Sequence, residues 1–151
     1  MRAFLCAWAL LIAAGASADE PARCKISMVH ALEGNGGVDP KLERLKPYFE
    51  KPPFTSWKQF KLLDEKQLEV KPGAPAEFKL PNGKDGSLTY VDHLLQGQGK
   101  HRLRLKLAIS DAGKKVLETV IVLDEGGVFL QAGQKLQQGL LVLAFSCLTG
   151  S

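Results

Sequence analysis

Short runs in which apolar and polar residues alternate recur along most of this 151-residue chain. Phe78, for example, stands between the charged residues Glu77 and Lys79. Such a period of two is typical of a β-strand that buries one face. Turn-forming sequences such as Pro81-Asn82-Gly83 separate the runs. The segments expected as strands are 24–31, 57–63, 68–70, 76–80, 88–95, 101–109, 116–123, 128–131 and 140–147.

Eight or nine short strands at this spacing predict a mainly β fold, an antiparallel β-sandwich or a barrel-like domain. One short α-helix is expected near the N-terminus of the domain. Asp39 can cap its first turn, and Pro40 suits the first helical position. The apolar stripe of this helix consists of Leu42, Leu45 and Phe49. Pro47 has no amide hydrogen, so the helix should end or kink near Lys46.

The segment around residue 112 is expected to be a β-hairpin. Asp111-Ala112-Gly113 suits a three-residue loop with a positive φ at Gly113. Counting back from that loop places Lys106 opposite Glu118, so one cation should pair across the strands. The segment 116–123 is apolar on both faces, which predicts a central strand.

The first eighteen residues have the features of a secretory signal peptide. Arg2 supplies a positive charge, residues 3–14 are apolar, and Ala16-Ser17-Ala18 offers small residues for cleavage. The apolar run is shorter than the roughly 20 residues that a membrane-spanning helix needs. We therefore expect cleavage after Ala18 and a single exported domain, residues 19–151, in the periplasm or outside the cell.

Three cysteines occur in the chain, and Cys6 lies inside the expected signal peptide. The other two, Cys24 and Cys147, lie near the ends of the exported domain, where disulfides persist. A bridge between them should join the first strand to the last. A metal site or a redox pair is not expected, because the two cysteines are far apart in sequence and Cys-x-x-Cys is absent.

One strand carries four basic residues at a period of two: Lys100, Arg102, Arg104 and Lys106. This spacing places them on one face, where they are candidates for binding the anionic groups of a lipid, a glycan or a nucleic acid. The alternative is a solvated face whose charges pair with the neighbouring strand. The formal net charge of +4 is mild and few aromatic residues are interleaved, which argues against nucleic acid.

Catalytic and cofactor motifs are absent from the sequence. No nucleophile elbow, zinc-protease motif or phosphate-binding loop occurs, and no cofactor is expected. The three histidines, His30, His93 and His101, all fall on expected strands. Glu33, Asn35 and Asp39 lie around a glycine-rich loop, residues 32–38. Their oxygens do not follow a calcium-binding order, so loop structure and helix capping account for them. A hydrolase site assembled from dispersed residues stays an alternative, but the sequence predicts a protein that is not an enzyme.

Several short strings resemble an uncharacterised family of small exported bacterial proteins that have one short helix and a β domain. The strings are Asp39-Pro40-Lys41-Leu42, Pro53-Phe54-Thr55-Ser56-Trp57, Phe60-Lys61-Leu62-Leu63, Leu80-Pro81-Asn82-Gly83 and Ala132-Gly133-Gln134. The resemblance implies a bacterial envelope setting and no particular activity.

The leading hypothesis is an exported binding or structural accessory domain of the bacterial envelope, with an envelope protein as its partner. An exposed sheet edge or the glycine-rich loop would be the contact surface. The alternatives are a polyanion or envelope-lipid binder that uses the basic strand, and a small hydrolase with a dispersed site.

Overall fold

The computed structural model describes residues 20–96 and 100–149. The expected signal peptide, residues 1–18, lies outside these residues, and so do residues 97–99, which precede the basic residues 100–106 in the sequence. Across the described part of the chain, no helix is long and apolar enough to cross a membrane.

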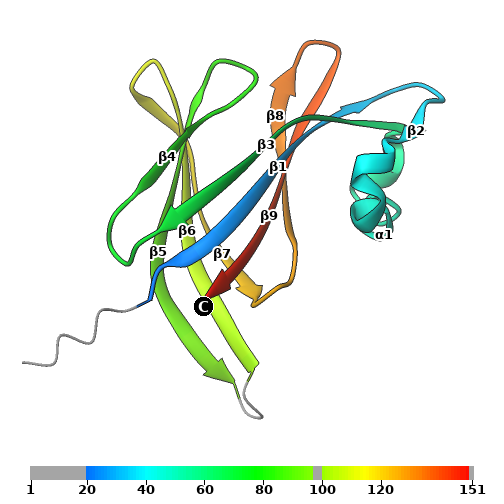
Figure 1. Ribbon diagram of the computed structural model, residues 1–151. Helices are drawn as coiled ribbons and strands as arrows, with labels where there is room; N and C mark the ends of the chain where they lie inside the picture. The colour runs from blue at the N-terminus through cyan, green and yellow to red at the C-terminus, as the bar shows by residue number, and fades with distance from the viewer. Residues whose placement is uncertain (1–19, 97–99, 150–151) are drawn as a thin grey trace, which may run out of the picture.

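The described residues form nine strands in two sheets that pack face to face (Figure 1). The five-stranded sheet contains, in spatial order, β2 (Gly37–Val38), β3 (Gln59–Val70), β1 (Ala22–Leu32), β9 (Gly139–Thr149) and β8 (Phe129–Leu136). The four-stranded sheet contains β4 (Ala76–Lys79), β5 (Asp85–Gln96), β6 (Lys100–Asp111) and β7 (Lys114–Asp124). This arrangement confirms the expected mainly β, sandwich-like fold with one short helix.

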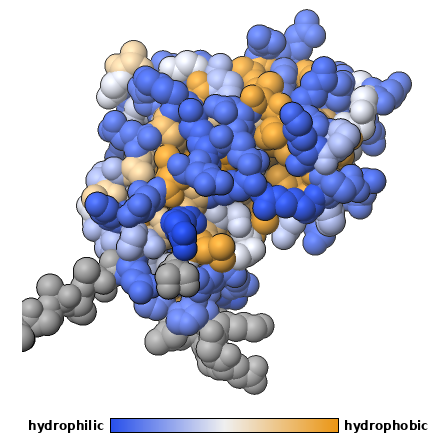
Figure 2. All heavy atoms as spheres, viewed as in Figure 1, coloured by the Kyte–Doolittle hydropathy of each residue, from blue (hydrophilic) through white to orange (hydrophobic). Residues whose placement is uncertain are grey.

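The five-stranded sheet is buried on both faces at its centre, where β1 lies beside β9. In β1, Ile26 and Met28 pack between the two sheets, whereas Val29 and Ala31 belong to a second apolar cluster on the opposite face. Residues of β9 alternate in the same way, with Phe145 fully buried between the sheets. Hydrophilic residues cover most of the face turned to the viewer in Figure 2, and hydrophobic residues show between them.

The second cluster lies under a helical segment that follows β2. This segment comprises a 3₁₀ turn (Pro40–Leu45), the four-residue helix α1 (Lys46–Phe49) and a 3₁₀ turn (Phe54–Ser56). Asp39 caps the first turn as expected, because its Oδ1 accepts the backbone N–H of Lys41 at 3.0 Å. The Phe49 ring stacks on Phe60 of β3, with their centroids 4.1 Å apart. The 3₁₀ turn gives way to α1 at Lys46, where the kink was expected.

The predicted bridge joins Cys24 to Cys147, which lie opposite each other on β1 and β9. The two residues are 123 positions apart in sequence. The disulfide therefore links the first strand of the domain to its last strand, as the cysteine positions predicted.

The sequence prediction of two separate strands between residues 57 and 70 is wrong. Segments 57–63 and 68–70 do not form two strands, because β3 runs continuously from Gln59 to Val70. A register shift against β1 leaves Leu63 as the extra residue of a bulge, since Met28 faces Asp64 and Val29 faces Leu62. The extra residue interrupts the alternation on which the sequence prediction depended.

The hairpin between β6 and β7 also differs from the prediction. Its loop has two residues, because Asp111 faces Lys114, and Ala112 and Gly113 take φ angles of 48° and 83°. Positive φ at both central positions is the geometry of a tight type I′ hairpin. A bulge follows in β7, since Ser110 faces Lys115 and Ile109 faces Leu117.

The two-residue loop and the bulge each shift the register of β7 by one residue relative to the prediction. Lys106 therefore faces Val120, and Glu118 faces Ala108, so the predicted facing pair Lys106–Glu118 is wrong. The prediction that 116–123 is a central strand is also wrong, because β7 is the end strand of the four-stranded sheet.

We expect the disulfide to contribute a large part of the stability of the fold. Closing a loop of this length with a disulfide adds about 4–5 kcal/mol to the free energy of unfolding in the chain-entropy model, because the bridge restricts the unfolded chain. The double variant Cys24→Ala/Cys147→Ala should lose that amount of unfolding free energy in urea titrations. Reduced wild type is the control and should unfold at nearly the same urea concentration as the variant. A loss below about 1 kcal/mol would contradict the assignment of the bridge as the main clamp between the chain ends.

Candidate functional site

The basic residues singled out from the sequence lie on β6, and Lys100 is its first residue. The cations whose side chains are described are Arg102, Arg104 and Lys106. The leucines that alternate with them, Leu103, Leu105 and Leu107, are fully buried between the sheets. Successive side chains of a strand point to opposite faces, so the three cations lie on the outer face of the four-stranded sheet.

Two of these three cations form ion pairs with the adjacent strands. Arg102 Nε lies 2.7 Å from Asp124 Oδ1 of β7, and Arg104 Nη1 lies 3.1 Å from Asp92 Oδ2 of β5. Both pairs are exposed, so each should contribute at most about 1 kcal/mol to stability. Each carboxylate also cancels part of the positive field that an anionic ligand would meet at these arginines.

The end strand β7 offers a different kind of site. Within the described residues it pairs with β6 alone, and no strand pairs with its other edge. Other stretches also lack a neighbouring strand, among them residues 61–70 of β3, which carry five charged side chains, and the end strand β8, whose pairing with β9 shifts register between Gln131 and Gln134. Charges and irregularities of this kind discourage a second chain from pairing with an edge. By contrast, residues 119–123 of β7 read Thr-Val-Ile-Val-Leu and carry no charge.

The outer face of β7 exposes apolar side chains. Val116, Val120 and Val122 are 47%, 55% and 45% exposed, whereas Ile121 and Leu123 are buried in the core. Valines on both faces resemble a central strand in the sequence, which is why the edge was missed. Glu118, in the middle of the strand, was the available signal, because a strand buried on both faces rarely carries a charge.

The charges at the two ends of β7 are of opposite sign. Lys114 and Lys115 begin the strand, and Asp124 and Glu125 stand at its end. Lys115 forms an ion pair with Glu118, and this contact is the main reason why the pKa of Glu118 is held below its usual value. Asp124 pairs with Arg102, while Lys114 has no ion-pair partner in the described part of the chain.

A second group of side chains lies where β5 and β6 extend beyond the sandwich (Figure 1). The rings of His93 and His101 stack with their centroids 5.4 Å apart. They line a hollow of about 450 Å³ with Asp92, and Glu125 is close enough to interact electrostatically with both rings. Neither ring forms a hydrogen bond to an acid or a hydroxyl within the described residues. His30 is buried elsewhere and contacts the Leu136 carbonyl oxygen at 3.1 Å.

The described residues contain no group of three or more histidine, cysteine, aspartate or glutamate side chains that could hold a metal ion. Beside the glycine-rich loop, the carboxylate of Asp39 already accepts hydrogen bonds from the backbone N–H groups of Lys41 and Leu62. The bond from Lys41 is the main reason why the pKa of Asp39 lies below its usual value. Capping thus accounts for this acid, as the sequence suggested.

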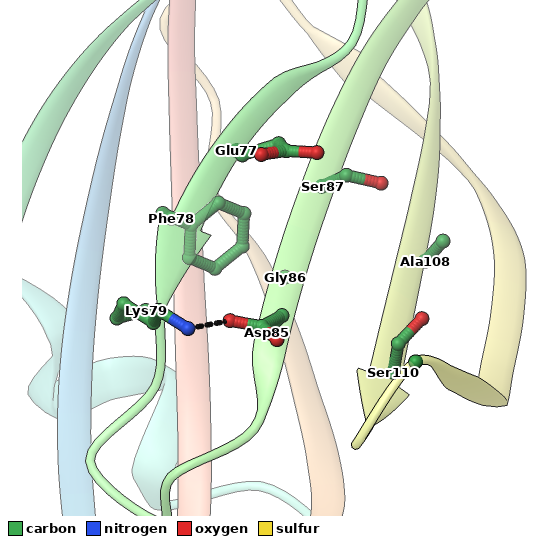
Figure 3. Close-up of a pocket in the computed structure, with 9 residues that line it drawn as sticks. Glu77, Phe78, Lys79, Asp85, Gly86, Ser87, Ala108 and Ser110 are labelled. Atoms are coloured by element: carbon green, nitrogen blue, oxygen red, sulfur yellow. Dashed lines mark hydrogen bonds and ion pairs between the residues drawn. The ribbon is translucent and has the colours of Figure 1, made fainter.

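A shallow hollow on the outer face of the four-stranded sheet adjoins β4 (Figure 3). The Phe78 ring lies over Gly86, where an added Cβ would come within 2.4 Å of a ring carbon. Lys79 forms an ion pair with Asp85 beside it. The contacts of these residues are structural: the ring covers a glycine, and the two charges satisfy each other.

Glu125 provides a pH-dependent contact near the end of β7. It accepts hydrogen bonds from the backbone N and the Oγ1 of Thr149, at 2.7 and 2.8 Å. The backbone bond is the largest of the effects that hold the pKa of Glu125 below its usual value. A lowered folded-state pKa means that the stability gained is present above the unfolded-state pKa and is lost as the pH falls through the folded value.

Glu125→Gln should therefore be less stable than wild type at neutral pH, because a charged acceptor bonds more strongly than an amide. The difference in unfolding free energy should disappear in acid, where Glu125 is protonated. Urea titrations at a series of pH values, from neutral to acid, measure the difference in unfolding free energy between the variant and wild type. Glu77→Gln is the matched control, since Glu77 accepts no hydrogen bond in the described part of the chain, and its effect should not change with pH in this way. A deficit of Glu125→Gln that persists in acid would contradict the assignment.

Taken together, the described surface offers backbone groups and exposed valines on β7, a charge-paired basic face on β6 and a stacked histidine pair on β5 and β6. These groups can form contacts with another molecule. Comparisons with protein-family models, with curated proteins and with solved structures find no match to this chain.

Proposed function

We propose that this chain is an exported, non-enzymatic binding or structural accessory domain of the bacterial envelope. It contacts a protein through the open edge and outer face of β7. The observation that carries the proposal is the uncharged, uncovered stretch 119–123, with half-exposed valines at 120 and 122.

Export to the envelope is supported by three observations. The first eighteen residues have the pattern of a signal peptide. The bridge between Cys24 and Cys147 suits an oxidising compartment, which the periplasm and the cell exterior both provide. The short strings around Asp39 and Pro81 resemble those of small exported bacterial proteins.

Protein contact is supported by the chemistry of an open edge. Backbone N–H and C=O groups along an end strand can pair with an extended segment of another chain, and alternate side chains then supply specificity. On β7 these side chains are Val120 and Val122 on the outer face. A polar ligand such as a glycan would leave these valines without an apolar partner, whereas side chains of an added strand would contact them from the side.

The alternative of a polyanion or lipid binder depends on Lys100, Arg102, Arg104 and Lys106. It is less well supported, because Arg102 and Arg104 already pair with Asp124 and Asp92. That alternative requires affinity for an anionic polymer or vesicle that falls steeply with salt and is lost in Arg102→Glu/Arg104→Glu.

A photo-reactive amino acid placed at Val120 should form a discrete protein adduct in living cells. The same group at Val91, which is 48% exposed on β5 of the same sheet, is the matched control and should form none. Mass spectrometry of the adduct identifies the protein attached. Equal labelling from both positions, or no protein adduct at Val120, would refute β7 as the contact surface.

A further inference from the structure

We infer that the partner of β7 is a second copy of this chain, paired antiparallel with it, edge to edge. The two four-stranded sheets would then form one continuous sheet across a two-fold axis. This inference rests on the proposed function, because it names the protein that covers the same edge.

The first step of the argument is that the edge needs a cover. Residues 119–123 combine β-branched side chains, no proline and no charge, which is the composition that pairs readily with other strands. Proteins usually protect such edges with charges, bulges or covering elements. The bulge at Val116 and the charges around it protect only the beginning of β7. The rest of the strand, up to Asp124, has no such protection among the described residues.

The second step is charge complementarity. The basic end of β7, Lys114-Lys115, and its acidic end, Asp124-Glu125, are separated by the uncharged stretch. Antiparallel pairing of two copies places the basic end of each beside the acidic end of the other, and the two-fold axis repeats that contact. Parallel pairing would instead place like charges together. The strand is therefore complementary to itself in one orientation only, and Lys114 gains the ion-pair partner that it lacks among the described residues.

The third step is the register. Facing residues of the two strands must have their side chains on the same face of the joined sheet. The two-fold axis therefore passes beside one residue of β7, which faces its own copy, and not between two residues. Centring on Ile121 would bring Glu118 opposite Asp124, and like charges directly opposite each other are unfavourable. Centring on Val120 avoids that contact and places the two Val120 side chains face to face. The sides of the two valines then contact each other across the two-fold axis.

Edge pairing buries less surface than the standard interface of about 1,600 Å², so we expect a dimer that forms in the micromolar range. Light scattering on the purified exported chain, from micromolar to near-millimolar concentration, should show a mass that rises from one copy to two. Val120→Lys should weaken self-association by more than about tenfold, because two ammonium groups would face each other. Val91→Lys is the matched control, because Val91 has a similar exposure but lies on β5, away from β7. This variant should dimerise like wild type.

The register has its own test. Under mild oxidation, Val120→Cys should form a covalent dimer on a non-reducing gel, whereas Val91→Cys should stay a single chain. Circular dichroism of each variant confirms that it folds.

A purified chain that stays monomeric over the whole range, or a Val120→Lys variant that dimerises like wild type, overturns the inference. If the monomeric chain still cross-links a different protein from Val120 in cells, the proposed function stands and only the second copy is wrong. If neither a dimer nor any protein adduct at Val120 forms, both are wrong.

Discussion

The pairing of β1 with β9 is the interaction on which the rest of the structure depends. These neighbours bring the first and last strands of the domain together, and the Cys24–Cys147 bridge joins them covalently. Both strands are buried on two faces. One face of each strand packs against the four-stranded sheet, and the opposite face lies under the helical segment. If this pair separated, both apolar clusters would lose the residues that β1 and β9 contribute to them. The other elements are therefore placed by what they cover on this central pair.

The four-stranded sheet has a different position, and its surface chemistry follows from it. Only its inner face packs on the core, so its outer face meets solvent and carries the ion pairs of Arg102 and Arg104. Its end strand β7 pairs on one side only. The same architecture that buries the central strands on both faces thus leaves the uncharged edge of β7 uncovered, and that edge is the surface on which we base the function.

Much of the fold could be predicted from the sequence because its determinants are local. Alternation located most of the strands, Asp39 and Pro40 marked the start of the helical segment, and the positions of two distant cysteines indicated the bridge. The errors arose at the bulges at Leu63 and Val116. One inserted residue shifts the strand register there, and no local sequence pattern indicates the insertion.

The candidate site was harder to predict, because its properties depend on which strands are neighbours. Valines on β7 indicate a buried strand when the sheet order is unknown and an exposed contact edge once it is known. The pairing of Arg104 with Asp92 and the stacking of His93 on His101 likewise depend on cross-strand register. Two of the three described cations on β6 are therefore already paired with acids, and the edge that was not visible in the sequence becomes the leading candidate.

The most direct measurement is amide hydrogen exchange of residues 119–123 as a function of protein concentration. Outward amides of an uncovered edge exchange rapidly, and they become protected only when another strand accepts their hydrogen bonds. Our account predicts that protection of these amides rises with concentration, while the amides at the centre of β1 and β9 stay protected throughout. Exchange on β7 that is rapid at every concentration would contradict the pairing of this edge with a second copy.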